Sequence, residues 1–154
     1  MTAITFLASS KPFKIPPEIL NLTNRTLFEK EEDFQFFTVQ EIHASWEKEV
    51  KEVLSLPYLY EVEGVGTHSF MTYLEKYMEI GDVFEIYNIP NQHAFESYVK
   101  QMQEDPAPIL VDTGKYTYQD RYGSYQLQPN KWLEELSHRN YITPYGITTF
   151  VKTK

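Results

Sequence analysis

The stretch Tyr58-Leu-Tyr-Glu-Val-Glu63 decides the fold class. Its aromatic and β-branched residues predict a strand, and its alternation of apolar with acidic side chains indicates that one face of that strand meets water. A strand of a parallel sheet covered on both faces would be apolar almost throughout. The stretch therefore favours an α+β fold, with helices packed on a mixed or mainly antiparallel sheet.

The residues that follow leave one alternative open. Amphipathic helices over 70–78 and 91–102 alternate with apolar strands over 83–89 and 109–111, and the connections are long enough for right-handed crossovers. The alternative is thus an α/β fold with a short parallel unit at 58–112.

Residues 115–127 predict a β-hairpin. With Asp120 to Gly123 as the loop, Tyr118 lies opposite Tyr125, and one face of the hairpin is apolar while the other is polar. The remaining predicted elements are strands over 2–8, 34–42 and 146–152, a helix from Trp46 to Leu54 with Ser45 as its N-cap, and a helix beginning at Asn130.

Length and composition indicate one globular domain over residues 1–154, since 42% of the residues are hydrophobic and 16% are aromatic. The absence of cysteine excludes disulfides, thiolate metal sites and thiol nucleophiles. The first ten residues lack the pattern of a secretory signal, and no apolar stretch has the length of a membrane span. We therefore expect a soluble, cytoplasmic protein with no membrane partner.

Charge is distributed unevenly along the chain. The net charge of −8 combines +2 over residues 1–25, −13 over 26–112 and +3 over 113–154. An acidic body of this kind attracts basic partners and repels the phosphates of nucleic acids. We therefore expect no nucleic-acid partner.

No motif in the sequence names a reaction. The four histidines have no second ligand at metal-binding spacing, and three of them, His43, His68 and His93, recur every 25 residues at predicted helix starts. The spacing leaves an internal repeat open, and a neutral capping or surface role is expected for these imidazoles. We predict no catalytic residue, no metal and no cofactor.

Two short motifs admit a functional and a structural interpretation. Asp112-Thr-Gly114 would belong to an active site only in a dimeric aspartic protease, and Ser9-Ser10-Lys11 follows a strand where phosphates often bind. The first lacks the apolar flank of a protease, and the second lacks glycines. Both are interpreted as turns.

Tyrosines provide the candidate binding residues. Six of the twelve have no place on a predicted core face: Tyr58, Tyr60, Tyr87, Tyr122, Tyr141 and Tyr145. Tyrosine is favoured at recognition surfaces because its ring is large, stiff and amphipathic. With the cationic groups of the last third of the chain, the predicted site residues are Tyr58, Tyr60, Tyr87, Arg121, Tyr122, His138, Arg139 and Tyr141.

Three functional hypotheses remain. The first is a binding or regulatory protein whose acidic helices and tyrosines hold another, basic protein. The second is a binder of a small anionic ligand, with an aromatic-lined pocket in which Arg121, Arg139 or Lys11 orients the ligand. The third, the least supported, is a metal-independent enzyme built on Asp112, Asp120 and His138.

Overall fold

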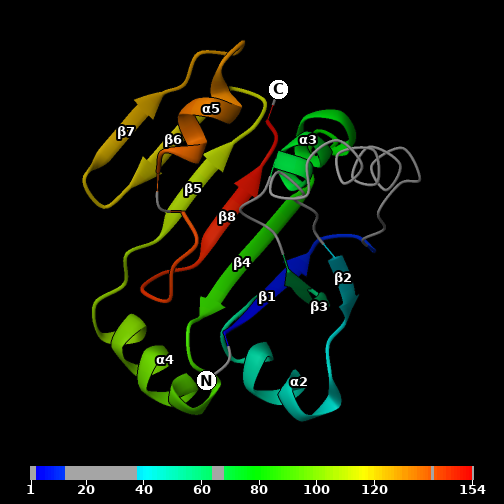
Figure 1. Ribbon diagram of the computed structural model, residues 1–154, viewed down its shortest axis with the longest axis vertical. Helices are drawn as coiled ribbons and strands as arrows, with labels where there is room; N and C mark the ends of the chain where they lie inside the picture. The colour runs from blue at the N-terminus through cyan, green and yellow to red at the C-terminus, as the bar shows by residue number, and fades with distance from the viewer. Residues whose placement is uncertain (1–2, 13–37, 64–67, 140, 154) are drawn as a thin grey trace, which may run out of the picture.

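The computed structural model describes residues 3–12, 38–63, 68–139 and 141–153 (Figure 1). These residues form one sheet of eight strands, accompanied by four α-helices and a short 3-10 helix. The strands are β1 (Ile4–Ser9), β2 (Thr38–Glu41), β3 (Tyr58–Glu63), β4 (Val83–Ile89), β5 (Ile109–Asp112), β6 (Thr117–Asp120), β7 (Gly123–Gln126) and β8 (Thr148–Val151). The helices are α2 (Ala44–Lys51), α3 (His68–Tyr77), η2 (Gln92–Ala94), α4 (Phe95–Glu104) and α5 (Trp132–Ser137).

The strand order is β2-β3-β1-β4-β8-β5-β6-β7. Every neighbouring pair is antiparallel except β5 and β8, which are parallel. The α+β prediction, with a mainly antiparallel sheet, is confirmed, and the sheet includes one parallel unit. No helix in the described ranges has the length and apolar character needed to cross a bilayer.

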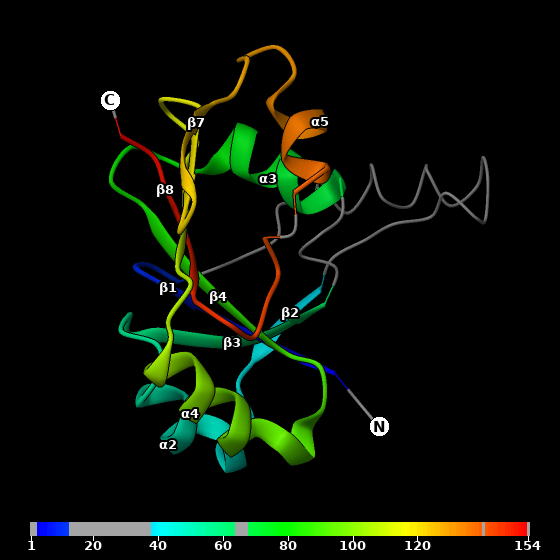
Figure 2. The ribbon, with the colours of Figure 1, turned by 90° about the vertical axis from the view of Figure 1, so that its left-hand side faces the viewer.

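Two hydrophobic clusters pack on opposite faces of the sheet. In β1, Leu7 joins one cluster while Phe6 joins the other, as the alternation of side chains along a strand requires. The first cluster lies against α3 and α5, and the second lies against α2 and α4 (Figure 2). The central strands β1 and β4 are therefore covered on both faces.

The element predictions agree with most of the structure. The predicted strands over 58–63 and 83–89 are observed with those bounds, and Tyr118 lies opposite Tyr125 as predicted. Of the strand predicted over 34–42, residues 34–37 lie outside the described residues.

Two local predictions are wrong in detail. The hairpin loop has two residues, because Asp120 pairs directly with Gly123. The N-cap of α2 is His43, not Ser45, and the His43 Nδ1 atom accepts a hydrogen bond of 3.1 Å from the Ser45 backbone N–H. His43 therefore takes the capping position that the sequence left open for it.

Candidate functional site

The eight predicted site residues lie in three places. Tyr87 and Tyr141 belong to the hydrophobic clusters, Tyr58 and Tyr60 lie on β3, and Arg121, Tyr122, His138 and Arg139 lie in or near the β6–β7 hairpin. The structure thus brings the candidates together as two surface groups near opposite ends of the sheet order.

Tyr87 and Tyr141 are core residues, in contrast to the surface role expected of them. The Tyr87 hydroxyl donates a buried hydrogen bond of 2.9 Å to the Pro144 carbonyl, and burial raises the pKa of this hydroxyl to about 12. The Tyr141 ring meets Phe150 edge-on with 5.8 Å between centroids, and burial raises its pKa as well. Tyr87 is enclosed because β4 is a central strand covered on both faces, which the local pattern does not reveal.

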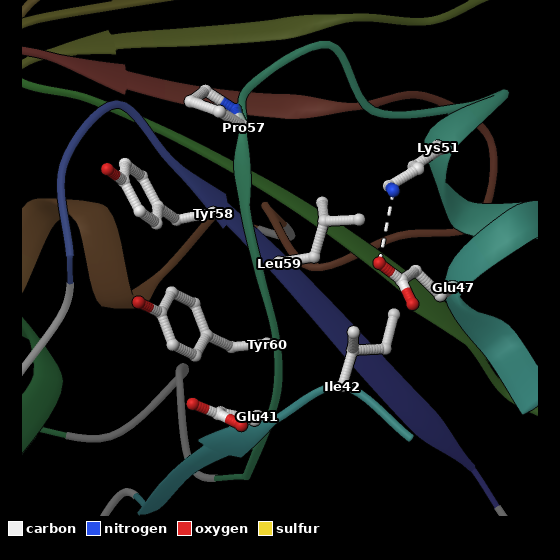
Figure 3. Close-up of a pocket in the computed structure, with 8 residues that line it drawn as sticks. All are labelled: Glu41, Ile42, Glu47, Lys51, Pro57, Tyr58, Leu59 and Tyr60. Carbon is white, nitrogen blue, oxygen red and sulfur yellow. Dashed lines mark ion pairs between the residues drawn. The ribbon is translucent and has the colours of Figure 1, made fainter. Parts of the chain in front are cut away.

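A pocket of about 300 Å³ at the end of β2 holds the other two tyrosines, and we call it the edge pocket (Figure 3). It is lined by Glu41, Ile42, Glu47, Lys51, Pro57, Tyr58, Leu59 and Tyr60. The pocket exists because β2 ends opposite Tyr60, whereas β3 begins two residues earlier. The start of β3 therefore has no β2 residue beside it.

The side chains of the edge pocket point to two sides of β3. Tyr58 and Tyr60 point to one side, whereas Leu59 points to the other, toward Ile42 and α2 (Figure 3). Glu41 lies opposite Tyr60 in the β2–β3 register, so its carboxylate lies at the Tyr60 end of the pair of rings. The Tyr58 side chain is 42% exposed and offers its ring to solvent.

The edge pocket carries surplus negative charge. Lys51 is paired with Glu47 at 3.0 Å, and both side chains are exposed, so this ion pair adds little stability. Glu41 has no cationic partner among the described residues. Over residues 38–63 the sequence has six glutamates and two lysines. Sequence reasoning missed Glu41 and Glu47 as site residues, because their place depends on where β2 ends.

The second surface group surrounds the hairpin, and we call it the hairpin cluster: Tyr118, Arg121, Tyr122, Tyr125 and Arg139. The Arg139 guanidinium lies 4.7 Å from the ring centroid of Tyr118 and 4.4 Å from that of Tyr125. Such cation–π contacts favour the orientation in which the guanidinium lies over the rings. Arg121 is paired with Asp105 at 3.0 Å, and Tyr122 is 82% exposed at the hairpin tip.

Tyr125 and His138 are both exposed in this region. Tyr125 was expected on the core face, and it does share that face with Tyr118, but it remains 38% exposed because β7 is at the margin of the sheet. His138 is exposed and forms the C-cap of α5, as its position after the last predicted helix turn indicated.

Asp112 has a structural role that agrees with the turn interpretation. Its Oδ1 atom accepts hydrogen bonds from the backbone N–H groups of Gly114, Lys115 and Thr153, and its Oδ2 atom accepts one from the Thr153 hydroxyl. Burial raises the pKa of this carboxyl, but the hydrogen bonds outweigh burial and hold the pKa below its usual value. Both oxygens are therefore engaged in holding the turn.

The groups named for an enzyme do not converge on one pocket. Asp112 lies opposite Thr117, at one end of β6, whereas Asp120 lies at the other end. Across the described ranges, no three histidine, aspartate or glutamate side chains are grouped so that they could hold a metal ion.

Lys11 is also engaged within the fold. Its ammonium group pairs with Asp82 at 2.8 Å and with Glu79 at 3.3 Å, and the hydrogen bond to Asp82 raises the lysine pKa. The preceding Ser9 and Ser10 hydroxyls accept backbone hydrogen bonds from Lys11 and Val83. The segment is a turn held by polar contacts within itself and to residues 79–83.

The geometry leaves two surface groups, an acidic pocket with two tyrosines and an arginine held against tyrosine rings. Comparison with known proteins adds no analogy for either group, because the chain matches no protein-family model, no curated protein and no solved structure.

Proposed function

We propose that the protein is a non-enzymatic binding or regulatory protein that holds a basic protein partner at the edge pocket. The observation that carries the proposal is the exposed ring of Tyr58 on the same side of β3 as Tyr60, together with the carboxylate of Glu41 opposite Tyr60, which has no cationic partner among the described residues. A lysine or arginine side chain of a partner fits such a site, since the rings attract the cation and the carboxylate accepts its hydrogen bonds.

The wider charge distribution supports the same class of partner. The pocket lies within residues 26–112, whose net charge is −13. A field of this sign speeds the approach of a basic protein and makes its binding sensitive to salt. Tyrosine and a charged rim are also the residue types found at the centre and border of protein interfaces.

The small anionic ligand of the second hypothesis has weaker support. Of the three cations expected to orient it, Lys11 pairs with Asp82, and Arg121 pairs with Asp105. At these two cations an anionic ligand would have to displace the carboxylates, which reduces the gain from binding it, and only Arg139 has no paired carboxylate in the described ranges.

The test uses a fluorescent lysine-rich peptide of about ten residues that also carries one aromatic residue, followed by capture of partners on the tagged protein. We expect binding at about 50 mM salt that is largely lost at about 500 mM, because screening shortens the range of the charges. The double variant Tyr58→Ala and Glu41→Gln should lose at least about tenfold in affinity for the peptide.

A matched control is the double variant Tyr122→Ala and Glu96→Gln, which also removes one exposed tyrosine and one exposed carboxylate, but at other sites. It should bind the peptide within about twofold of the original chain, as substitutions away from an interface do. Equal losses in both double variants would show that net charge alone attracts the peptide, and the edge pocket would be rejected as the site.

A further inference from the structure

The strand β7 is an open edge of the sheet. It is the last strand in the sheet order, and all four of its residues are exposed (Figure 1). Within the part of the chain that the structure describes, no other strand pairs with its outer side. Its sequence Gly-Ser-Tyr-Gln contains neither the lysine nor the proline with which proteins commonly block an edge.

The register shows which backbone groups of β7 are free. Asp120 and Gly123 close a two-residue loop and form a hydrogen-bonded pair, and hydrogen-bonded pairs then alternate along the ladder. The bond of 2.7 Å from the Leu127 N–H to the Tyr116 carbonyl agrees with this alternation. The N–H and C=O groups of Ser124 and Gln126 therefore point away from β6, toward the open side.

A cation lies above the same edge. Arg139 lies over the Tyr125 ring, 4.4 Å from its centroid, on the face of the sheet that α5 covers. In the described ranges no carboxylate pairs with Arg139, in contrast to Arg121, which pairs with Asp105. The guanidinium thus lies against two rings, while its hydrogen-bond donors have no anionic partner among the described residues.

We propose that an extended, acidic segment of a partner protein adds to β7 as a further strand, with its carboxylate bound by Arg139. The backbone of the segment would bond to Ser124 and Gln126. Adjacent strands lie about 4.8 Å apart, so a side chain beside Tyr125 on the same face comes within reach of the guanidinium. A carboxylate at that position can form the two parallel hydrogen bonds that arginine favours.

Charge favours a partner segment over a second copy of this chain. The hairpin, α5 and β8 belong to residues 113–154, whose net charge is +3, and this sign attracts an acidic segment. A second copy carries a net charge of −8 and is repelled as a whole. Pairing of two β7 strands would also bury less area than a stable dimer needs, because each strand has only four residues.

The test measures fluorescence anisotropy of a labelled peptide of about ten residues with alternating glutamate and threonine, since threonine favours the extended state. A lysine–threonine peptide is the charge-reversed probe. Two variants address the two halves of the proposal. Ser124→Pro removes an outward N–H without removing a bond to β6, and Arg139→Gln removes the cation.

We expect the acidic peptide to bind and each of the two variants to weaken binding at least about tenfold. Lys100→Gln removes one positive charge from the exposed face of α4 and should leave affinity within about twofold. Amide hydrogen exchange of Ser124 and Gln126 should slow when the peptide is added, whereas the Tyr125 amide, already bonded to β6, should change little.

Three results would overturn the proposal. They are no saturable binding of the acidic peptide up to about 1 mM, equal binding of the lysine peptide, or unchanged exchange at Ser124 and Gln126 in the bound state. The exchange measurement uses the original chain, so it decides the question even if a variant fails to fold. A fourth result would assign the edge to a second copy and would also overturn the proposal. It is self-association of the chain in sedimentation runs without peptide, together with slowed exchange of the same two amides.

Discussion

The two edges of the sheet offer recognition of different kinds. At the β2–β3 edge, the edge pocket presents side chains, namely two tyrosines and a surplus of negative charge. At the β7 edge, the surface consists of free backbone groups beside a cation held by two rings. The sheet order places these edges at its opposite ends, so the separation of charge along the sequence becomes a separation in space.

The structures that support the two edges also differ. Behind the edge pocket, α2 and α4 cover one face of the sheet with an apolar cluster. Leu110 of β5 is 40% exposed on its face of the sheet, so no helix of the described residues fully covers that face in the half that carries β7. In the β7 half the apolar cluster lies on the other face, against α5, and close backbone contacts and the hydrogen bonds of Asp112 hold the connections there.

The largest effect is expected from Gly146→Ala. A Cβ atom at position 146 would lie 2.0 Å from the Ala107 carbonyl oxygen, so the backbone that leads into β5 must move. We expect a loss of about 3 kcal/mol or more in the free energy of unfolding, measured by urea titration.

Gly81→Ala is the matched control for this prediction. A Cβ atom there meets nothing within 4 Å, but the φ angle of +96° is unfavourable for alanine. The expected loss of about 1 kcal/mol comes from backbone strain alone. If both substitutions cost the same, the close approach of residues 107 and 146 does not hold the β7 half together.

The next effect is that of Asp112→Ala, which leaves three backbone N–H groups without their acceptor. We expect a loss of about 2–3 kcal/mol at pH 7. Because folding lowers the pKa of Asp112, its contribution is complete above the unfolded pKa of about 3.9 and is lost as pH falls from there through the folded pKa.

The measurement compares the free energies of unfolding of the original chain and the variant at pH 7 and near pH 3. The difference between them should shrink at the lower pH. Asp112→Asn keeps an acceptor oxygen for the backbone groups but cannot titrate, so it should cost less and lose less of its own stability with acid. A difference that grows with acid would contradict the lowered pKa.

The sequence predicts those features of the two edges that a local residue pattern determines. The strand at 58–63 and the Tyr118–Tyr125 pairing follow from alternation and turn residues, which are local. The edge pocket depends on the register between β2 and β3, and the exposure of Tyr125 depends on β7 being the last strand. Strand order and register arise from contacts between distant segments, so neither feature could be read from the local sequence.

An effect on stability of intermediate size is expected from Glu85→Ala, and this variant also tests whether the two edges act independently. The Glu85 carboxylate accepts hydrogen bonds from the Ser55 N–H at 2.8 Å, the Leu56 N–H at 3.0 Å and the Ser55 hydroxyl at 2.9 Å. These bonds hold the loop that leads through Pro57 to the edge pocket. Glu85→Ala should cost about 1–2 kcal/mol in the free energy of unfolding.

The same variant should lower the affinity of the lysine-rich peptide for the edge pocket and leave the affinity of the acidic peptide for β7 unchanged. Binding of both peptides is measured by anisotropy on one preparation, and Glu96→Gln, which changes an exposed carboxylate of α4, is the control. A loss of both peptides would mean that a disturbance at one edge reaches the other.

The smallest effect on stability is expected from Tyr122→Ala. The side chain is 82% exposed, so its removal should change the free energy of unfolding by at most about 0.5 kcal/mol. Tyr87→Phe, which removes only the hydroxyl bonded to the Pro144 carbonyl, should cost more, about 1 kcal/mol, although it deletes a single atom. Thermal unfolding of the two variants checks this order. The reverse order would place Tyr122 in a contact that stabilises the fold, and the tip of the hairpin would then not be a free surface.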